Sequence, residues 1–124
     1  MTIHEAISYI DNVKPNKYPE STKISWLSSL DGVIKKEIID THEGGENIEY
    51  SPYTESTPIS RKLIVDHPYD DIYTKFLEMQ IDYYNGEYKR YNNSKVLYNV
   101  AFDDFSRSYN ASHKPLSKGT WQHF

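Results

Sequence analysis

The chain has 124 residues, a net charge of −4 from 18 acidic and 14 basic residues, and no cysteine. A chain of this length forms a single domain with one hydrophobic core. The lack of cysteine excludes disulfides, thiolate metal sites and cysteine nucleophiles, and the acidic balance argues against a general nucleic-acid-binding protein. Twelve tyrosines favour a surface that binds other proteins. No apolar run is long enough for a signal peptide or a membrane span, which predicts a soluble protein made in a cytoplasm.

Two amphipathic helices are predicted at the start of the chain. Thr2 and Glu5 have the spacing of a capping box, and isoleucines follow at helical intervals, so residues 2–13 are expected to form the first helix. A longer apolar stripe predicts a second helix over residues 19–40, which the glycine pair at 44–45 ends.

The connection that follows differs in composition. From Glu37 to the residue before Arg61 there are six acidic residues and no Lys or Arg. Two β-like runs, NIEY at 47–50 and KLIV at 62–65, predict a short β-hairpin or a pair of edge strands around residues 46–66. A solvated surface loop is the alternative interpretation of the same segment.

The C-terminal half reads as two more helices. Pro68 is expected to open the third helix with Asp66 as its cap, and aromatic residues continue its stripe at helical spacing. The Asn85-Gly86 pair lies between helical stripes, which favours a helix end or a close helix approach over a strand hairpin. We therefore expect a break within residues 85–93, with the polar run at 92–94 capping the fourth helix.

These elements predict a mainly α protein, a small bundle of about four helices with the β insertion at 46–66. Residues 1–113 form the helical domain, and residues 114–124 form an extended C-terminal arm, since Pro115 and Gly119 prevent continuation of the last helix. The predicted core positions lie on the apolar stripes and are Leu27, Leu30, Ile34, Phe76, Leu77, Ile81, Ala101, Phe102 and Phe105.

Motifs with a catalytic or metal-binding mechanism are not found. Adjacent carboxylates at 70–71 and 103–104 point about 100° apart on a helix, so neither pair converges on a substrate. The histidines lack the spacing of a metal site and are His4, His42, His67, His113 and His123. The sequence therefore predicts no enzyme, no metal and no cofactor.

A basic and aromatic segment at residues 87–95, EYKRYNNSK, supports a different function. Lys89, Arg90 and Lys95 are interleaved with tyrosines, a pattern suited to base stacking and phosphate contacts. Residues 69–124 carry seven acids and seven bases, so the charge excess that dominates nucleic-acid binding is missing. A small nucleic-acid-binding protein remains the alternative hypothesis.

Residues 63–115, LIVDHPYDDIYTKFLEMQIDYYNGEYKRYNNSKVLYNVAFDDFSRSYNASHKP, resemble a known group of proteins. They are similar to small proteins of tailed phages and prophages of Gram-positive bacteria. Those proteins carry a strand ending in Pro-Tyr-Asp-Asp, then Ile-Asp-Tyr-x-Asn-Gly-Glu, Arg-Tyr-Asn-Asn-Ser and a closing Tyr-Asn-x-x-His. The group resembles the head–tail connector family, also called adaptor or head-completion proteins.

The resemblance implies a mostly helical subunit that assembles into a ring, dodecameric in relatives, beneath the portal protein. Such a ring extends the DNA channel in the virion neck and docks the stopper or tail-completion protein. DNA passes through without specific binding, and no membrane, catalytic residue or cofactor is involved. The protein would be made in the host cytoplasm and incorporated into the virion.

Three groups of residues are expected to serve this role. Acidic residues suit a channel through which DNA slides, and the acid-rich loop offers Glu43, Glu46 and Glu49, the loop glutamates. Tyrosine-rich helix surfaces suit contacts between subunits, and the candidates are Tyr84, Tyr88 and Tyr91. The arm is expected to anchor on the portal through Lys114, Pro115, Leu116, Trp121 and Phe124.

Overall fold

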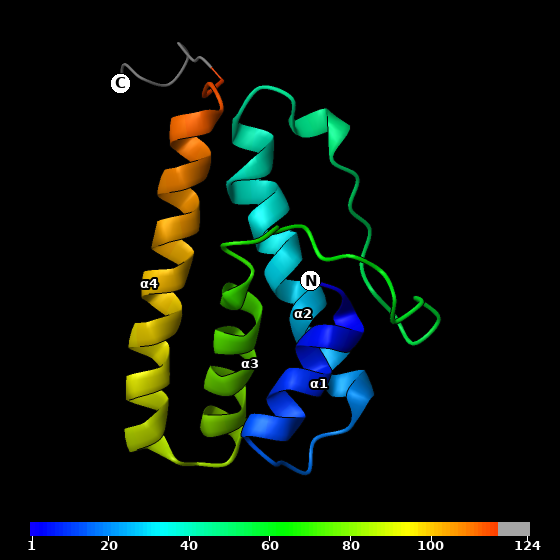
Figure 1. Cartoon of the computed structure of the whole chain (residues 1–124), viewed down its shortest axis with the longest axis vertical. Coiled ribbons are helices and arrows are strands. Elements are labelled where there is room, and N and C mark those ends of the chain that lie inside the picture. The colour runs from blue at the N-terminus through cyan, green and yellow to red at the C-terminus, as the bar shows by residue number, and fades with distance from the viewer. Residues whose placement is uncertain (117–124) are drawn as a thin grey trace.

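The structure, a computed structural model, describes residues 1–116 of the chain. These residues fold into the mainly α bundle that the sequence predicts, with four α-helices and two short 3-10 helices (Figure 1). The helices are α1 (Ile3–Val13), α2 (Glu20–Glu37), η1 (Ile39–Thr41), η2 (Gly45–Asn47), α3 (Asp71–Tyr84) and α4 (Tyr88–Ser112). The α1–α2 connection and the α3–α4 turn lie at one end of the bundle, and α4 ends at the other (Figure 1).

The first helix forms as its sequence predicts. The Thr2 hydroxyl accepts a hydrogen bond from the Glu5 N–H at 3.1 Å, and the Glu5 carboxylate accepts one from the Thr2 N–H at 2.8 Å. This reciprocal pair satisfies two backbone donors that a helix start leaves free. The buried face of α1 consists of Ile3, Ala6, Ile7 and Ile10.

The third and fourth helices both begin at residues other than those predicted. Helix α3 starts at Asp71 rather than Pro68, and Asp66 does not cap it. Helix α4 starts at Tyr88 and runs straight through residues 92–94. Ser94 is buried inside this helix, where its hydroxyl donates to the Asp82 carboxylate at 2.9 Å instead of capping a new helix.

The predicted β-hairpin is wrong. In the described part of the chain the two β-like runs do not pair with each other, and Lys62 instead forms an isolated antiparallel bridge with Thr2. The Leu63 N–H donates to the Met1 carbonyl at 3.0 Å, while Tyr50 reaches α2 and donates to the Ser28 carbonyl at 2.6 Å. The 62–65 run bonds to Met1, to Asp31 of α2 and to Tyr73 of α3, and the Tyr50 side chain also bonds to α2. The backbone of the second run is therefore satisfied without pairing with the first.

Seven of the nine predicted core residues are buried. These seven, with the isoleucines of α1 and the apolar residues Ile72, Tyr73, Leu63 and Val65, form one continuous core between the helices. Phe76 and Phe102 are half-buried instead and lie at its edge. They are less enclosed because α4 packs mainly on α3, with little contact to α2.

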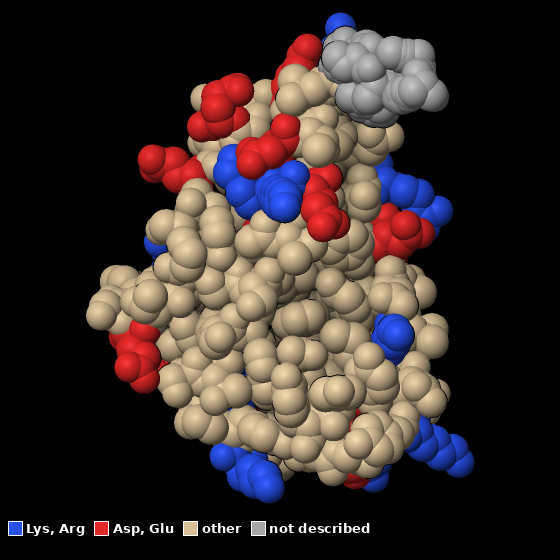
Figure 2. All heavy atoms as spheres, turned by 180° about the vertical axis from the view of Figure 1, so that it is seen from behind, with Lys and Arg blue, Asp and Glu red and all other residues tan. Residues whose placement is uncertain are grey.

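Charged side chains are unevenly distributed over the surface. Seen from behind, Lys, Arg, Asp and Glu gather towards the end where α4 finishes and along the rim, and a broad central area carries none (Figure 2). Helix α2 contributes to this pattern, because Asp31 is the one charged residue between positions 24 and 34 and its side chain is fully buried.

Candidate interaction surfaces

A buried carboxylate fixes the long connection between α2 and α3. Asp31 on α2 accepts hydrogen bonds from the hydroxyls of Tyr53 and Tyr73, both at 2.6 Å, and from the Ile64 N–H at 3.1 Å. Tyr73 accepts in turn from the Val65 N–H at 2.7 Å. Burial raises the pKa of Asp31 above its usual value, and the three hydrogen bonds oppose that rise. This centre is structural: it ties the connection to α2 and α3 without opening to solvent.

The α3–α4 turn is built around the glycine that the sequence marked. Gly86 has a φ of +74°, so it adopts the left-handed conformation that ends many helices. Its N–H donates to the Tyr83 carbonyl at 3.0 Å, and the Glu87 N–H donates to the Asp82 carbonyl at 3.0 Å. These two bonds are those of a Schellman motif, and they reverse the chain in three residues.

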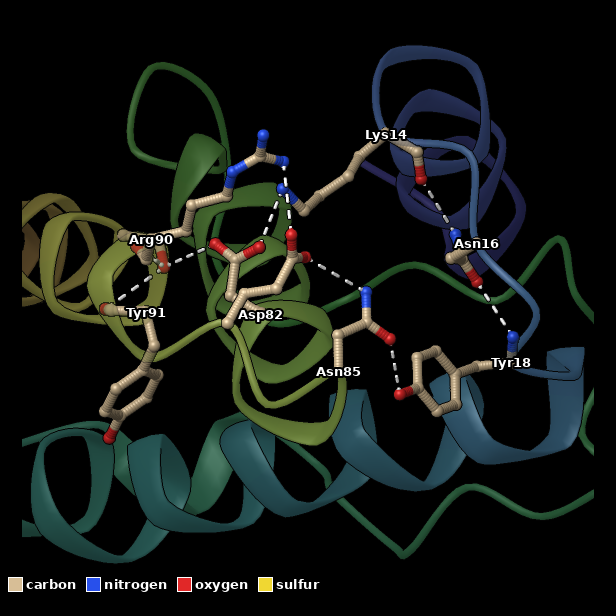
Figure 3. A network of polar contacts seen from close by, with 9 residues as sticks. Lys14, Asn16, Tyr18, Asp82, Asn85, Arg90 and Tyr91 are labelled. Atoms are coloured by element: carbon tan, nitrogen blue, oxygen red, sulfur yellow. Dashed lines mark hydrogen bonds and ion pairs between the residues drawn. The ribbon is translucent and has the colours of Figure 1, made fainter.

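Charge and hydrogen bonds lock this turn to the α1–α2 connection (Figure 3). The Lys14 ammonium lies 2.7 Å from Oδ1 of the buried Asp82 and forms an ion pair with it. This oxygen accepts no hydrogen bond of good geometry within the described residues, so the ion pair is its main stabilising contact. Nearby, the Tyr18 hydroxyl donates to Asn85 at 2.7 Å, and Asn16 orients Tyr18 through a bond to its N–H. The end of the bundle is therefore a rigid platform.

Aromatic side chains cover this platform. The aromatic corner consists of Tyr18, Trp26, Tyr83, Tyr84, Tyr88 and Tyr91. Trp26 and Tyr84 are stacked with centroids 5.6 Å apart and planes inclined by 10°. Tyr88 keeps 64% of its surface exposed and Tyr84 keeps 57%. Large exposed aromatic rings on a rigid support are typical of protein-binding surfaces.

The structure brings the three predicted subunit-contact tyrosines to this corner. Tyr84 and Tyr88 are exposed and Tyr91 is half-buried. Sequence reasoning missed Tyr18 and Trp26, which come from the α1–α2 region more than fifty residues earlier. The available signal was the position of Trp26 on the polar side of the α2 stripe, where a large aromatic residue has no core to fill.

Helix α4 also exposes apolar side chains away from the aromatic corner. Val96, Leu97 and Val100 are each exposed by 50% or more. Val96 and Val100 lie on the side away from the buried residues Ala101 and Phe105. Leu97, four positions before Ala101, borders α3 and lines a cleft with Asp82. No part of residues 1–116 covers the two valines, so this side of a long helix is a second candidate interaction surface.

The basic segment at the start of α4 does not form a concentrated positive face. The Arg90 guanidinium lies 3.5 Å from the Glu87 carboxylate, and the Lys95 ammonium lies 5.8 Å from the Tyr91 ring centroid. Lys89 is exposed. One of the three cations is thus paired with an acid, which weakens the pattern that the nucleic-acid hypothesis requires.

The first residues of the predicted arm pack on the helical domain. The Glu43 N–H donates to the Lys114 carbonyl at 2.8 Å, and the Leu116 N–H donates to the Thr41 carbonyl at 3.0 Å. Pro115 bridges His42 in the same short antiparallel contact. All three predicted anchor residues among 114–116 remain exposed at their side chains, whereas Trp121 and Phe124 lie outside the described residues.

The predicted channel residues lie on the surface. The loop glutamates are all exposed, on and beside η2. The loop backbone is held closely: a side chain at Gly45 would place its Cβ 2.5 Å from the Ile39 carbonyl oxygen, so only glycine fits there. The acidic groups are therefore presented from a packed support and not from a free chain.

The predicted carboxylate pairs serve as surface charges. Asp103 and Asp104 lie 3.2 and 3.3 Å from the Arg107 guanidinium, and Asp71 lies 3.7 Å from Lys75. Within residues 1–116 no group of three or more His, Cys, Asp or Glu side chains is arranged to hold a metal ion.

The histidines are scattered over the fold. His42 is buried and links η1 to Asn110 of α4 through a 3.1 Å contact, while His67 is almost fully exposed. His4 lies on α1 and His113 caps α4, and His123 is not among the described residues.

A shallow cleft of about 300 Å³ beside the α3–α4 turn is lined by Lys14, Glu78, Asp82, Arg90, Asn93, Ser94 and Leu97. Its acids and bases balance, and Asp82 is already paired with Lys14. None of the helices in the described part of the chain is long and apolar enough to cross a membrane.

Comparison of the chain with models of protein families, with curated proteins and with solved structures finds no match. The geometry of the two exposed surfaces therefore bears on function alongside the sequence resemblance.

Proposed function

We propose that this chain is a head–tail connector of a tailed phage or prophage. In this role it is a structural subunit that forms a ring beneath the portal, extends the DNA channel and docks the stopper or tail-completion protein. The sequence resemblance over residues 63–115 suggests the family, and those residues supply α3, the Asn85-Gly86 turn and α4.

One observation carries the proposal: a single small subunit exposes two separate apolar surfaces. The aromatic corner lies at the α3–α4 turn and the outward side of α4 lies further along that helix, and each exposes apolar side chains within the described residues. A monomer rarely exposes such patches without using them. A subunit in a closed ring needs two different side faces, because each copy contacts its neighbours through unlike surfaces.

The charge distribution supports the same role. The loop glutamates are exposed on a packed loop, so they can line a passage without disturbing the fold. Repulsion between such carboxylates and phosphates keeps DNA from adhering to the wall of a channel. The arm supports portal docking through its composition, since Trp121 and Phe124 are residues typical of interface anchors.

Binding to portal tests the proposal. The chain is mixed with the portal protein encoded beside it, and complexes are examined by size-exclusion chromatography and negative-stain electron microscopy. We expect the full chain to form a ring on the portal. A chain ending at Leu116, which keeps the contact with Thr41, is expected to fold with unchanged thermal stability but to lose portal binding.

A titration with duplex DNA distinguishes the connector proposal from the nucleic-acid hypothesis. A connector leaves duplex DNA unbound at moderate salt, whereas a nucleic-acid-binding protein that uses Lys89, Arg90 and Lys95 binds with steep salt dependence. Absence of portal binding together with salt-dependent DNA binding would replace the connector proposal with that alternative.

A further inference from the structure

The chain contains a single Asn-Gly pair, and this pair lies in the α3–α4 turn. In such a pair the side-chain amide and the next backbone nitrogen can react with each other, because glycine has no Cβ to hinder their approach. The space around Gly86 is open as well, since no atom lies within 4 Å of the position that a Cβ would take. Asn85 is exposed, so water reaches it. The turn therefore presents a reactive pair of groups to solvent.

We propose that Asn85 is a site of spontaneous deamidation and that the Tyr18 hydroxyl guards it. In this reaction the Gly86 nitrogen attacks Cγ of Asn85 and forms a C–N bond, while its proton passes to solvent. The bond between Cγ and Nδ2 then breaks, ammonia leaves, and a succinimide ring is closed. Water opens the ring at either of its carbonyl carbons and leaves aspartate or isoaspartate at position 85. Nothing in this chemistry depends on the connector role.

The folded turn keeps the two reacting groups apart. Asn85 has a ψ of −9°, so the Gly86 nitrogen nearly eclipses the Asn85 nitrogen and not the Cβ that carries the side chain. The Gly86 N–H also donates to the Tyr83 carbonyl at 3.0 Å, and this bond must break before the nitrogen can attack. Ring closure therefore requires a local opening of the turn in which Asn85 rotates about its Cα–C bond.

The Asn85 side chain is held in place mainly by a residue from outside the turn (Figure 3). Its Oδ1 accepts a hydrogen bond from the Tyr18 hydroxyl at 2.7 Å, whereas its Nδ2 donates to the Glu87 carboxylate at the longer distance of 3.4 Å. Asn16 in turn fixes Tyr18 by accepting from its N–H. Tyr18 is thus a positioning residue: it joins the turn to the α1–α2 connection and opposes the rotation that ring closure needs.

Deamidation alters the support of the aromatic corner. An isoaspartate adds one methylene to the main chain, which displaces the Gly86 N–H from the Tyr83 carbonyl. Either product also replaces the amide that donates to Glu87 with a carboxylate, which repels the Glu87 carboxylate. Because Tyr84 and Tyr88 stand on either side of the turn, their placement changes with it.

Peptide mapping by mass spectrometry tests the site. The full-length natural chain is aged in mildly alkaline buffer, and conversion at Asn85 is compared with conversion at Asn93, the exposed asparagine of an Asn-Ser pair. We expect Asn85 to convert first and to give both aspartate and isoaspartate, since both arise from the succinimide. Conversion is expected to be faster in urea, where the turn is absent. Conversion at Asn93 before Asn85 would overturn the proposal.

Tyr18→Phe tests the guard, because phenylalanine keeps the ring beside Trp26 and loses only the hydroxyl. We expect Asn85 to convert about fivefold faster in this variant, the factor that corresponds to the loss of a hydrogen bond of about 1 kcal/mol. The rate at Asn93 is expected to stay unchanged, which a general loss of stability would not produce.

Tyr88→Phe is the matched control, since it removes an exposed hydroxyl of the same corner that does not bond to Asn85, and it is expected to convert at the natural rate. Conversion of Asn85 in Tyr18→Phe that is no faster than in the natural chain, or that is absent from both chains, would overturn the proposal.

Discussion

Replacing Tyr73 with phenylalanine isolates the energetic role of the buried Asp31 centre. The Tyr73 ring is fully buried, and phenylalanine keeps it. The lost hydroxyl donates to Asp31 at 2.6 Å and accepts from the Val65 N–H at 2.7 Å. A hydrogen bond to a charged group contributes about 1.5–3 kcal/mol, and an unpaired buried N–H costs about 1–3 kcal/mol. We expect Tyr73→Phe to lower the free energy of unfolding by about 3 kcal/mol.

The cost is expected to depend on pH. Burial raises the pKa of Asp31 above 3.8 in the folded state, so this carboxyl contributes stability below that pH and loses it as the pH rises through its folded pKa. The Tyr73 bond opposes the rise, and its loss raises the folded pKa further. The variant therefore loses additional stability once Asp31 ionises. The penalty is larger at about pH 7 than at about pH 4.

Urea unfolding followed by circular dichroism at the two pH values measures both effects. Tyr50→Phe is the matched control, because its hydroxyl donates to the neutral Ser28 carbonyl and its cost is expected to be about 1 kcal/mol at either pH. A Tyr73→Phe penalty below about 1 kcal/mol, or one that grows in acid, would refute the assigned role of the Asp31 centre.

Three further predictions follow from burial, backbone geometry and exposure. Leu77→Ala, at a fully buried position, is expected to cost about 2–5 kcal/mol in chemical unfolding. Val96→Ala, on the open side of α4, is expected to cost less than about 0.5 kcal/mol, and similar losses in the two variants would mean that the helix faces are misassigned. Gly86→Ala is expected to cost about 1–2 kcal/mol, and the cost comes from the left-handed backbone alone because no atom lies within 4 Å of the added Cβ. Gly86→Asn is expected to cost less, since asparagine tolerates this conformation better. An unchanged melting temperature in Gly86→Ala would contradict the assigned turn. Changing the three loop glutamates to glutamine is expected to leave the free energy of unfolding within about 0.5 kcal/mol of the natural chain. The same change is expected to reduce DNA retention or ejection in assembled particles. Natural levels of both retention and ejection would show that the loop does not line the channel.

Local patterns in the sequence were sufficient where neighbouring residues decide the structure. The Thr2 and Glu5 spacing gave the start of α1, because a capping box involves residues three apart. Gly86 marked the end of α3 for a similar reason, since the left-handed conformation suits glycine. The apolar stripes also identified most of the core, because burial follows helical periodicity.

Long-range contacts account for the errors. The run at 62–65 has strand-like residues, but it bonds to Met1 and to Asp31, which no local pattern reveals. Residues 92–94 suit a helix cap, yet the Ser94 hydroxyl donates a hydrogen bond to the buried Asp82, twelve residues earlier in the chain. In each case a distant buried polar group outweighed local preference.

The candidate surfaces were also found from sequence only where local patterns suffice. Tyr84 and Tyr88 were identified from composition and spacing alone, and both are exposed. Trp26 could not be added to them from sequence, because its stack with Tyr84 depends on how α2 crosses the end of α3. The outward side of α4 was not identified either, although Val96 and Val100 lie off the apolar stripe to which Ala101 and Phe105 belong.

The connector proposal is tested most directly by cryo-electron microscopy of particles from the phage or prophage that encodes this chain. We expect a ring of copies beneath the portal, with the loop glutamates near the channel. Particles in which the density beneath the portal does not fit the four-helix subunit, or complete particles made without the chain, would contradict it.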